Sequence, residues 1–449
     1  MKRKIYNDLL KWKNEAQGRC ALLIEGARRI GKSYIVEEFA KNEYESYLLV
    51  DFSKAPKLVS EWFDAYLEDI DTLLGNLQLR YNKKLIPRKS LVVFDEIQNC
   101  PRAREAIKFL VADGRFDYIE TGSLVSIKKN VKDIQIPSEE DSIEMFPMDF
   151  EEFLWAMGEE LLMPYIRQQF ELRKPMGDFH RRAMDLFRQY MIVGGMPQAV
   201  QAFVDTRDFG AVDAVKRRIL GLYRNDIQKY ADRVENRVTA IFDEIPSQLQ
   251  RHEKRFRLSS LREDARMRNY ADAFFWLDDA KIINCCYNTT EPSVGLRLNE
   301  ARTSVKCYMG DTGLLISHAF DSKNIAVQQL YQKLMFGKLE INQGMLVENV
   351  VAQMLRASGH KLFFFGNTNV KDSDSRMEID FLITKPCVTS RHNIIPIEVK
   401  SGANYTIASL RKCVAKYHEQ IVQPTVLHSG DLQEVDGILY LPIYMTIML

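Results

Sequence analysis

The residues best suited to chemistry near the start of the chain form a run of type G-x-x-x-x-G-K-S. An apolar segment at residues 21–24 precedes the run, and a helical pattern follows it. In that setting, backbone N–H groups and the positive end of the helix can cradle phosphates. Lys32 would reach the β- and γ-phosphates of ATP, and the Ser33 hydroxyl would bind Mg²⁺. A chance glycine loop is the alternative. The residues expected to bind the nucleotide are Gly26, Ala27, Arg28, Arg29, Ile30, Gly31, Lys32 and Ser33.

Two acids follow another apolar segment. Asp95 and Glu96 come directly after residues 91–94, and Gln98 continues the run. Ligands of open α/β sheets bind beyond the carboxyl ends of the strands, so these acids lie where chemistry is expected. Asp95 would hold Mg²⁺ through its water shell, and Glu96 would orient and deprotonate the attacking water. The alternative is a pair of solvated acids at a strand end.

The next strand ends in Thr121-Gly122-Ser123. A small hydroxyl there can touch the γ-phosphate or the attacking water, and we expect Ser123 to be this sensor. A helix N-cap is the alternative role for that serine.

Isolated charges also interrupt two apolar segments near the end of the chain. Asp380 lies within residues 379–383, and Glu398 and Lys400 end the segment that starts at residue 394. Residues two apart in a strand point to the same face, so Glu398 and Lys400 should converge, and Asp380 can join them. Three charges on one sheet face are costly unless they pair or bind a metal.

This pattern resembles the active site of the PD-(D/E)xK nuclease superfamily. The resemblance implies that Asp380, Glu398 and Lys400 are catalytic, that Asp380 and Glu398 bind one or two Mg²⁺ ions, and that water attacks a phosphodiester. Glu348 matches the helix-borne acid that precedes this core. Two alternatives stay open: a surface strand pair with a salt bridge, and a nuclease-like fold kept only for binding.

The spacing of apolar segments predicts an α/β fold. Short apolar runs at residues 21–24, 47–51, 91–95 and 117–121 alternate with helical patterns, as in the parallel sheet of a P-loop NTPase. The predicted domains are a P-loop ATPase core (1–145), a helical subdomain (146–235), a winged helix-turn-helix domain (236–318) and a restriction-endonuclease-like α/β domain (335–449).

The winged-helix prediction combines helices over residues 238–249, 258–265 and 267–277 with a strand over 281–287 and a return strand near 296–298. This stretch is rich in basic residues that would face DNA phosphates, unless the element packs on the ATPase as a lid. They are Arg251, Lys254, Arg255, Arg257, Arg262, Arg266 and Arg268.

Composition indicates a soluble multidomain protein. The 449 residues are 46% hydrophobic and 27% charged, with a net charge of +1. The 7 cysteines include no C-x-x-C pair, which fits a reduced cytoplasmic setting. No signal peptide and no apolar window of roughly 20 residues is found, so we expect no membrane partner.

Several motifs together resemble the predicted AAA+-type ATPases of bacteria and archaea, which belong with the signal-transducing STAND ATPases. They are the Gly26–Ser33 run, Asp95-Glu96-x-Gln98, Thr121-Gly122-Ser123, the stretch over residues 146–153 and Gly194-Gly195-Met196-Pro197. The resemblance covers nearly the whole chain. It implies a helical and winged-helix region and a C-terminal domain of unknown function. It also implies an arginine finger, and the candidates are Arg28, Arg29, Arg115 and Arg224.

The leading hypothesis is an ATP-binding and ATP-hydrolysing regulatory protein coupled to a metal-dependent nuclease-like domain that acts on nucleic acid. The alternative is an ATP-dependent switch that binds DNA or a protein partner without cutting. A homo-oligomer fits either hypothesis. A helicase is disfavoured, because no further helicase motif is found.

Overall fold

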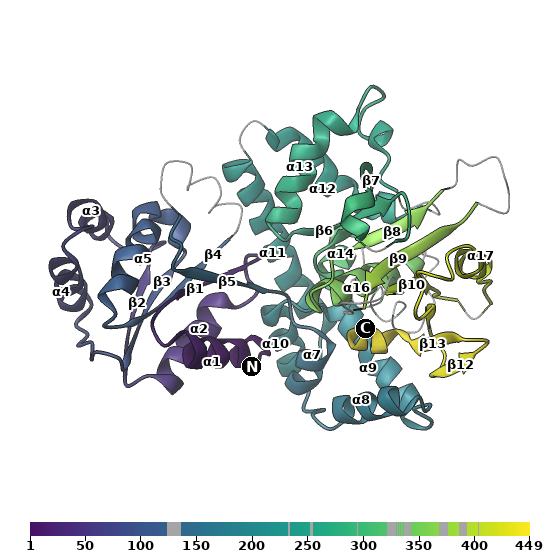
Figure 1. The fold of residues 1–449 in the computed structure, drawn as a ribbon, viewed down its shortest axis with the longest axis horizontal. Coiled ribbons are helices and arrows are strands. Elements are labelled where there is room, and N and C mark those ends of the chain that lie inside the picture. Colours follow the sequence, from purple (N-terminus) through teal and green to yellow (C-terminus); the bar gives the residue numbers. More distant parts are fainter. Residues whose placement is uncertain are drawn as a thin grey trace. The chain divides into compact units, whose positions relative to one another are not determined.

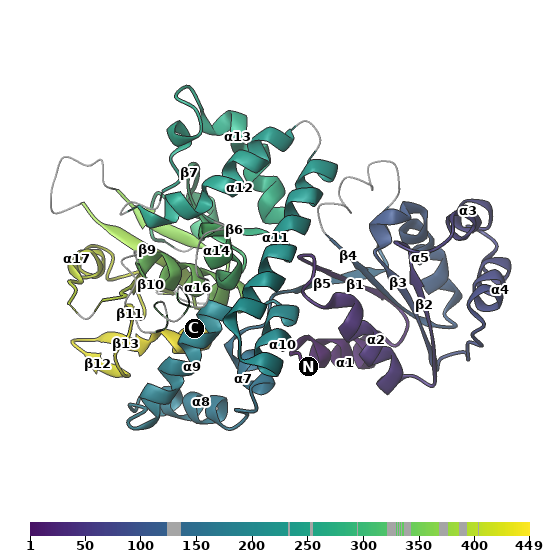
Figure 2. The same cartoon turned by 180° about the vertical axis from the view of Figure 1, so that it is seen from behind.

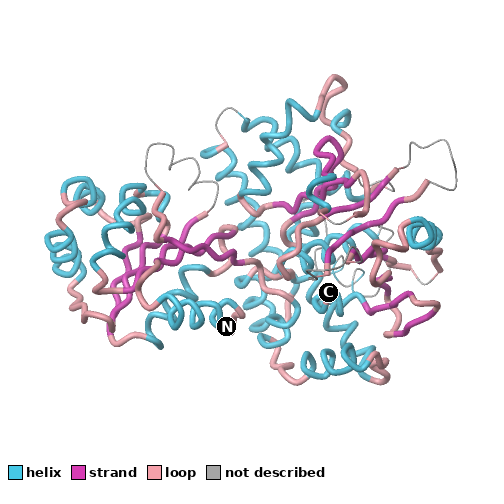
Figure 3. The backbone as a smooth tube through the Cα atoms, viewed as in Figure 1, coloured by secondary structure: helices cyan, strands magenta, loops and turns pink. Residues whose placement is uncertain are grey.

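A computed structural model describes the chain except residues 124–135, 232–233, 252–254, 294, 321–328, 330, 332, 334, 336–342, 368–375, 386–392 and 403. The chain forms two compact units, Met1–Phe146 and Pro147–Leu449. Figures 1 and 2 show the elements of each unit from opposite sides, and Figure 3 distinguishes helices from strands. The four-domain division stays a prediction.

The first unit contains a parallel five-stranded sheet of order β2-β3-β4-β1-β5. Its strands are β1 (Ala21–Gly26), β2 (Ser46–Asp51), β3 (Ser90–Asp95), β4 (Asp117–Gly122) and β5 (Glu140–Met145). The first four strands match the predicted segments. Strand β5 was not predicted, because its sequence EDSIEM lacks an apolar run. It lies at the edge of the sheet and pairs with β1.

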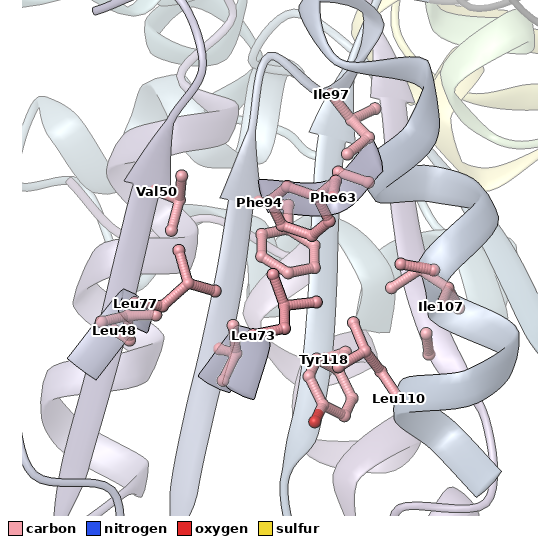
Figure 4. Close-up of a cluster of buried hydrophobic side chains, with 14 of the residues drawn as sticks. Leu48, Val50, Phe63, Leu73, Leu77, Phe94, Ile97, Ile107, Leu110 and Tyr118 are labelled. Atoms are coloured by element: carbon pink, nitrogen blue, oxygen red, sulfur yellow. The ribbon is translucent and has the colours of Figure 1, made fainter. Parts of the chain in front are cut away.

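Helices cover both faces of this sheet. They are α1 (Ile5–Ala16), α2 (Lys32–Glu43), α3 (Lys57–Ala65), α4 (Ile70–Tyr81) and α5 (Pro101–Asp113), with a 3₁₀ turn η1 (Ile97–Asn99). Helices α3, α4 and α5 share a hydrophobic core with the strands (Figure 4), while α2, with α1 against it, packs on the opposite face. In the core, the rings of Phe63 and Phe94 meet edge to face at 5.5 Å. This packing fixes β3, which carries Asp95 at its end.

The second unit begins with a set of helices. They are α7 (Phe150–Ala156), α8 (Leu162–Leu172), α9 (Phe179–Val193), α10 (Pro197–Thr206), α11 (Phe209–Tyr230), α12 (Glu235–Gln250), α13 (Met267–Asp279) and α14 (Thr312–Ala319). The unit also contains helices α16 (Gln343–Ala357) and α17 (Ala408–Lys416) and the 3₁₀ turns η4 (Leu258–Ser260), η5 (Leu296–Asn299) and η6 (Ile443–Met448).

A glycine pair between α9 and α10 brings several of these elements together. The N–H of Gly195 donates to Asp311 Oδ2 at 2.5 Å, and Asp311 also caps α14 by accepting the N–H of Leu314 at 2.8 Å. A Cβ on Gly195 would lie 2.2 Å from the carbonyl oxygen of Met148. The Gly194-Gly195-Met196-Pro197 run therefore has a packing role in this fold.

The second unit also contains an eight-stranded mixed sheet of order β12-β13-β11-β10-β9-β8-β6-β7. Its strands are β6 (Ile283–Thr289), β7 (Glu300–Met309), β8 (Phe363–Gly366), β9 (Glu378–Thr384), β10 (Ile394–Val399), β11 (Thr425–His428), β12 (Gln433–Val435) and β13 (Ile438–Pro442). Strand β9 runs antiparallel to both β8 and β10, whereas β10 and β11 are parallel.

Two details of the winged-helix prediction are wrong. The helix expected over residues 258–265 is reduced to the 3₁₀ turn η4, and the return strand expected near 296–298 is the 3₁₀ turn η5. Gly295 enters that turn at a φ of 81°, a left-handed conformation that interrupts an extended chain. The return strand is β7, and β6 pairs with β8, so the hairpin continues the C-terminal sheet.

Candidate functional site

The G-x-x-x-x-G-K-S run connects the end of β1 to the start of α2. Gly26 has a φ of 154° and Gly31 has a φ of 94°, values that side chains rarely allow. A Cβ on Gly26 would also lie 2.3 Å from the carbonyl oxygen of Met145, the last residue of β5. Both glycines are thus required by the backbone path of the loop.

Lys32 is buried in this loop. Its Nζ donates to the carbonyl oxygens of Gly26 at 3.0 Å and Ala27 at 2.9 Å. Burial lowers the pKa of Lys32, and the nearby Glu96 and Asp95 oppose that shift. Because its two hydrogen-bond acceptors are neutral carbonyls, the ammonium retains charge that an anion can neutralise.

Asp95 accepts two hydroxyl hydrogen bonds at the end of β3. The Ser33 Oγ donates to Asp95 Oδ1 at 2.8 Å, and the Thr121 Oγ1 donates to the same oxygen. Burial raises the pKa of Asp95, while the hydrogen bonds from Thr121 and Ser33 lower it. A hydroxyl and a carboxylate therefore lie side by side, which are oxygen donors that fit Mg²⁺.

Glu96 follows Asp95 with a left-handed backbone, at φ 56° and ψ 48°. A non-glycine residue in this conformation is held there by its surroundings, and such positions cluster at functional sites. The Nε2 of Gln98 donates to Glu96 Oε2 and so fixes the carboxylate. The Asp-Glu-x-Gln spacing thus lets Gln98 orient the acid.

The structure places Lys32, Ser33, Asp95 and Glu96 near one another, and their roles toward a nucleotide stay predictions. Thr121 was not selected as a site residue, yet it contacts Asp95 directly. Ser123 follows the end of β4, and its sensor role stays a prediction. Of the arginine candidates, Arg28 and Arg29 are exposed in the loop, whereas Arg115 pairs with Asp113 and Asp71, and Arg224 pairs with Asp243.

The charged residues predicted near the end of the chain also lie close together. Lys400 Nζ pairs with Glu398 Oε1 at 2.6 Å, and burial raises the pKa of Glu398, an effect that Lys400 opposes. Asp380 Oδ2 accepts the backbone N–H of Val399 at 2.9 Å. Glu348, on α16, accepts a hydrogen bond from the Tyr308 hydroxyl at 3.2 Å.

A residue missed by the sequence analysis, Lys306 on β7, lies among these acids. Its side chain is 1% exposed, and its Nζ is 3.0 Å from Glu378 Oε1 and 3.5 Å from Asp380 Oδ1. Burial alone would lower the pKa of Lys306, but Asp380, Glu378 and Glu348 raise it above its ordinary value. The lysine therefore supplies an internal positive charge to the carboxylates. Its place in an otherwise apolar strand, Val305 to Met309, was the available signal.

Metal binding by Asp380 and Glu398 stays a prediction. Within the described ranges, no group of three or more His, Cys, Asp or Glu side chains could hold a metal ion.

Several arginines of the predicted basic stretch are paired with acids. Arg255 lies 3.8 Å from Glu378, Arg262 pairs with Asp264 at 2.7 Å, and Arg251 pairs with Glu244 at 3.6 Å. Lys254 lies outside the described residues.

Three family models match parts of the chain. Residues 18–154 match an AAA domain. Residues 184–324 and 343–445 match two domains of unknown function, DUF8612 and DUF4143. None of the curated proteins matches the sequence. The AAA match and the parallel five-stranded sheet define residues 18–154 as an AAA-type P-loop ATPase domain.

Solved structures of low similarity include three ATPase-type or DNA-bound proteins of archaea. The Walker-type ATPase PABY2304 of Pyrococcus abyssi is 14% identical, with a TM-score of 0.40, over 71% of this chain and 95% of that one. A STAND protein with a tetratricopeptide repeat sensor from Pyrococcus horikoshii is 12% identical, with a TM-score of 0.28. The match covers 79% of this chain and 48% of that one.

The ORC1 protein of Aeropyrum pernix, solved in complex with DNA, is 12% identical, with a TM-score of 0.27, over 72% of this chain and 93% of that one. With TM-scores this low, the assignment depends on the AAA match and the site geometry. In the part of the chain that is described, no helix has the length and apolar character to cross a membrane.

Proposed function

We propose that this chain is a nucleotide-dependent switch that binds ATP with Mg²⁺ and hydrolyses the bond between its β- and γ-phosphates. The observation that carries the proposal is the convergence of Lys32, Ser33, Asp95 and Glu96 on one sheet edge, with Thr121 on Asp95. These side chains offer one cation, hard oxygen ligands and one orienting acid. They suit phosphoryl transfer to water, in which positioning and charge stabilisation supply most of the rate.

Each side chain has a role in this proposal. Lys32 leaves the carbonyls of Gly26 and Ala27 and binds the β- and γ-phosphates. Ser33 and Asp95 would hold Mg²⁺, which would supply Lewis-acid stabilisation of the phosphate charge. Glu96, oriented by Gln98, accepts the proton of the attacking water.

The test is ATP turnover by the Glu96→Gln variant. It should keep ATP affinity and lose about 100-fold or more in turnover, because the amide cannot accept the proton. Glu68→Gln is the matched control, since Glu68 is an exposed acid of the same unit. Turnover by Glu96→Gln at the wild-type rate would contradict the assignment of Glu96.

For the second unit, we propose binding of DNA or a protein partner without cutting. The absence of cutting is supported by Lys306, because an ammonium at 3.0 and 3.5 Å from Glu378 and Asp380 already supplies positive charge that a metal ion would bring. A cytoplasmic location and assembly into a homo-oligomer stay predictions.

A metal-dependent nuclease is the second candidate. It is favoured by the order α16-β8-β9-β10-α17-β11, the order expected for a restriction-endonuclease-like core. Glu348, Asp380 and Glu398 lie on α16, β9 and β10, and Lys400 directly follows β10. The two candidates are separated by incubating plasmid DNA with the protein, ATP, and Mg²⁺ or Mn²⁺. Cleavage that disappears in Lys400→Ala would favour the nuclease, whereas DNA retention without cleavage would favour the switch.

A further inference from the structure

Arg3 connects the phosphate-binding loop to the end of the first unit. Its Nη1 donates to the carbonyl oxygen of Ile30 at 2.7 Å, and its Nη2 donates to the carbonyl oxygen of Phe146 at 2.7 Å. The residue is 7% exposed, so these hydrogen bonds are largely shielded from water. Helix α1, which follows Arg3, is fixed to α2 by the Tyr6 hydroxyl, which donates to Glu43 at 2.8 Å.

The bond to Ile30 controls a group that can touch phosphate. In a trans peptide, the C=O of Ile30 and the N–H of Gly31 belong to one rigid plane and point in opposite directions. Because the Ile30 carbonyl points at Arg3, the Gly31 N–H points away from the guanidinium. Backbone N–H groups at this position bind phosphate at a helix N-terminus.

The bond to Phe146 reaches the place where the chain leaves the first unit. Phe146 is the last residue of that unit, and Pro147 starts the next. Strands β1 and β5 pair in register from Ala21↔Glu140 to Gly26↔Met145. The loop and the exit of the chain therefore start from adjacent strand ends, and one guanidinium joins them.

We propose that Arg3 is a positioning residue that couples the phosphate-binding loop to the junction at Phe146 and Pro147. The inference deepens the proposed ATP-binding function and depends on it. Phosphates that draw the Gly31 N–H inward strengthen the hold of Arg3 on Ile30, and the same guanidinium then restrains Phe146. Arginine suits this role because its planar fork donates from two separate nitrogens, whereas lysine has a single ammonium.

The experiment compares wild type, Arg3→Met and Arg3→Lys. Affinity is measured with a fluorescent ATP analogue, and hydrogen exchange is followed over residues 30–33 and 145–150 with and without ATP. Arg3→Met should weaken ATP binding roughly tenfold or more, because hydrogen bonds from a charged donor are lost. It should also abolish the ATP-dependent protection of residues 145–150. Arg3→Lys should fall between Arg3→Met and wild type.

Arg19→Met is the matched control. Arg19 also donates to backbone carbonyls, those of Ala16 at 3.2 Å and Glu15 at 3.0 Å, but at the far end of α1. The Arg19→Met variant should leave ATP affinity and the ATP-dependent protection of residues 145–150 unchanged. Thermal unfolding of each variant reports whether it is folded, and Arg3→Lys keeps the test informative if Arg3→Met unfolds.

The results distinguish failure of the role proposed for Arg3 from failure of the proposed ATP-binding function. Wild-type affinity and protection in Arg3→Met would overturn the inference, and reduced affinity with intact protection of residues 145–150 would overturn the coupling. Failure of the wild type to bind ATP would instead contradict the proposed function. In that case, hydrogen exchange without nucleotide still tests whether Arg3 restrains the loop and the junction. Arg3→Met should speed exchange in residues 30–33 and 145–150 together.

Discussion

Each unit contains a buried lysine close to two acids, and the two lysines have opposite roles. Lys32 donates to neutral carbonyls, and burial lowers its pKa. Lys306 pairs with Glu378 and Asp380, and these acids raise its pKa despite burial. A cation held by neutral groups is available to an incoming anion, whereas a cation held by carboxylates is already neutralised. The same residue type therefore indicates a ligand site in one unit and a structural ion pair in the other.

The largest expected effect is that of Lys32→Met on ATP turnover. Loss of the cation that faces the phosphates should lower kcat/KM for ATP by about 100- to 1,000-fold. Saturating ATP at 100 times Kd should stabilise the wild type by about 2.7 kcal/mol and this variant far less. Steady-state kinetics and thermal unfolding with ATP measure both. Equal stabilisation of the two proteins would remove the contrast between the lysines.

Lys306→Met should instead act on stability. It leaves Glu378 and Asp380 without their internal cation, and because these acids retain some exposure we expect a loss of about 2–3 kcal/mol in unfolding free energy. ATP turnover should not change. Arg302→Met on the same strand is the control, since its pair with Glu300 is at the surface and should contribute below about 1 kcal/mol. Urea unfolding distinguishes the two variants.

Thr121→Val sharpens the description of the phosphate site. The substitution keeps the shape but removes the hydroxyl that bonds Asp95, and turnover should fall about tenfold, with a small change in ATP affinity. Ser123→Ala is the comparison, because that residue is the sensor predicted from sequence. A larger loss in Ser123→Ala than in Thr121→Val would restore the original assignment.

The smallest expected effect is the pH dependence of stability. The pKa of Lys306 is higher in the folded than in the unfolded chain, so its contribution is complete below the ordinary value of 10.5 and is lost as pH rises through the folded pKa. The pKa of Lys32 is lower in the folded chain, so stability should rise with pH between that pKa and 10.5. Each slope is at most about 1.4 kcal/mol per pH unit. Compared with the wild type, urea unfolding of Lys32→Met should show a smaller rise of stability with pH below 10.5, and Lys306→Met a smaller fall above 10.5. Changes of the same sign would contradict the comparison.

The phosphate site could be predicted from the sequence because its parts are local. The run from Gly26 to Ser33 joins one strand to one helix, and Asp95 ends a strand of buried residues that Glu96 directly follows. Strand β5 was missed because its polar sequence shows neither alternation nor an apolar run. The return strand was misplaced because Leu296 and Leu298 are apolar but follow a left-handed Gly295.

The sequence by itself determined the phosphate-binding loop, four strands of its sheet and the acids at their ends, because backbone pattern and neighbouring residues specify them. Only the tertiary structure decided which distant groups meet them. Thr121 reaches Asp95 through the register of β4 on β3, Arg3 reaches Ile30 and Phe146 across the unit, and Lys306 reaches Asp380 through the packing of one sheet. Such contacts depend on strand order and register, which no local pattern encodes.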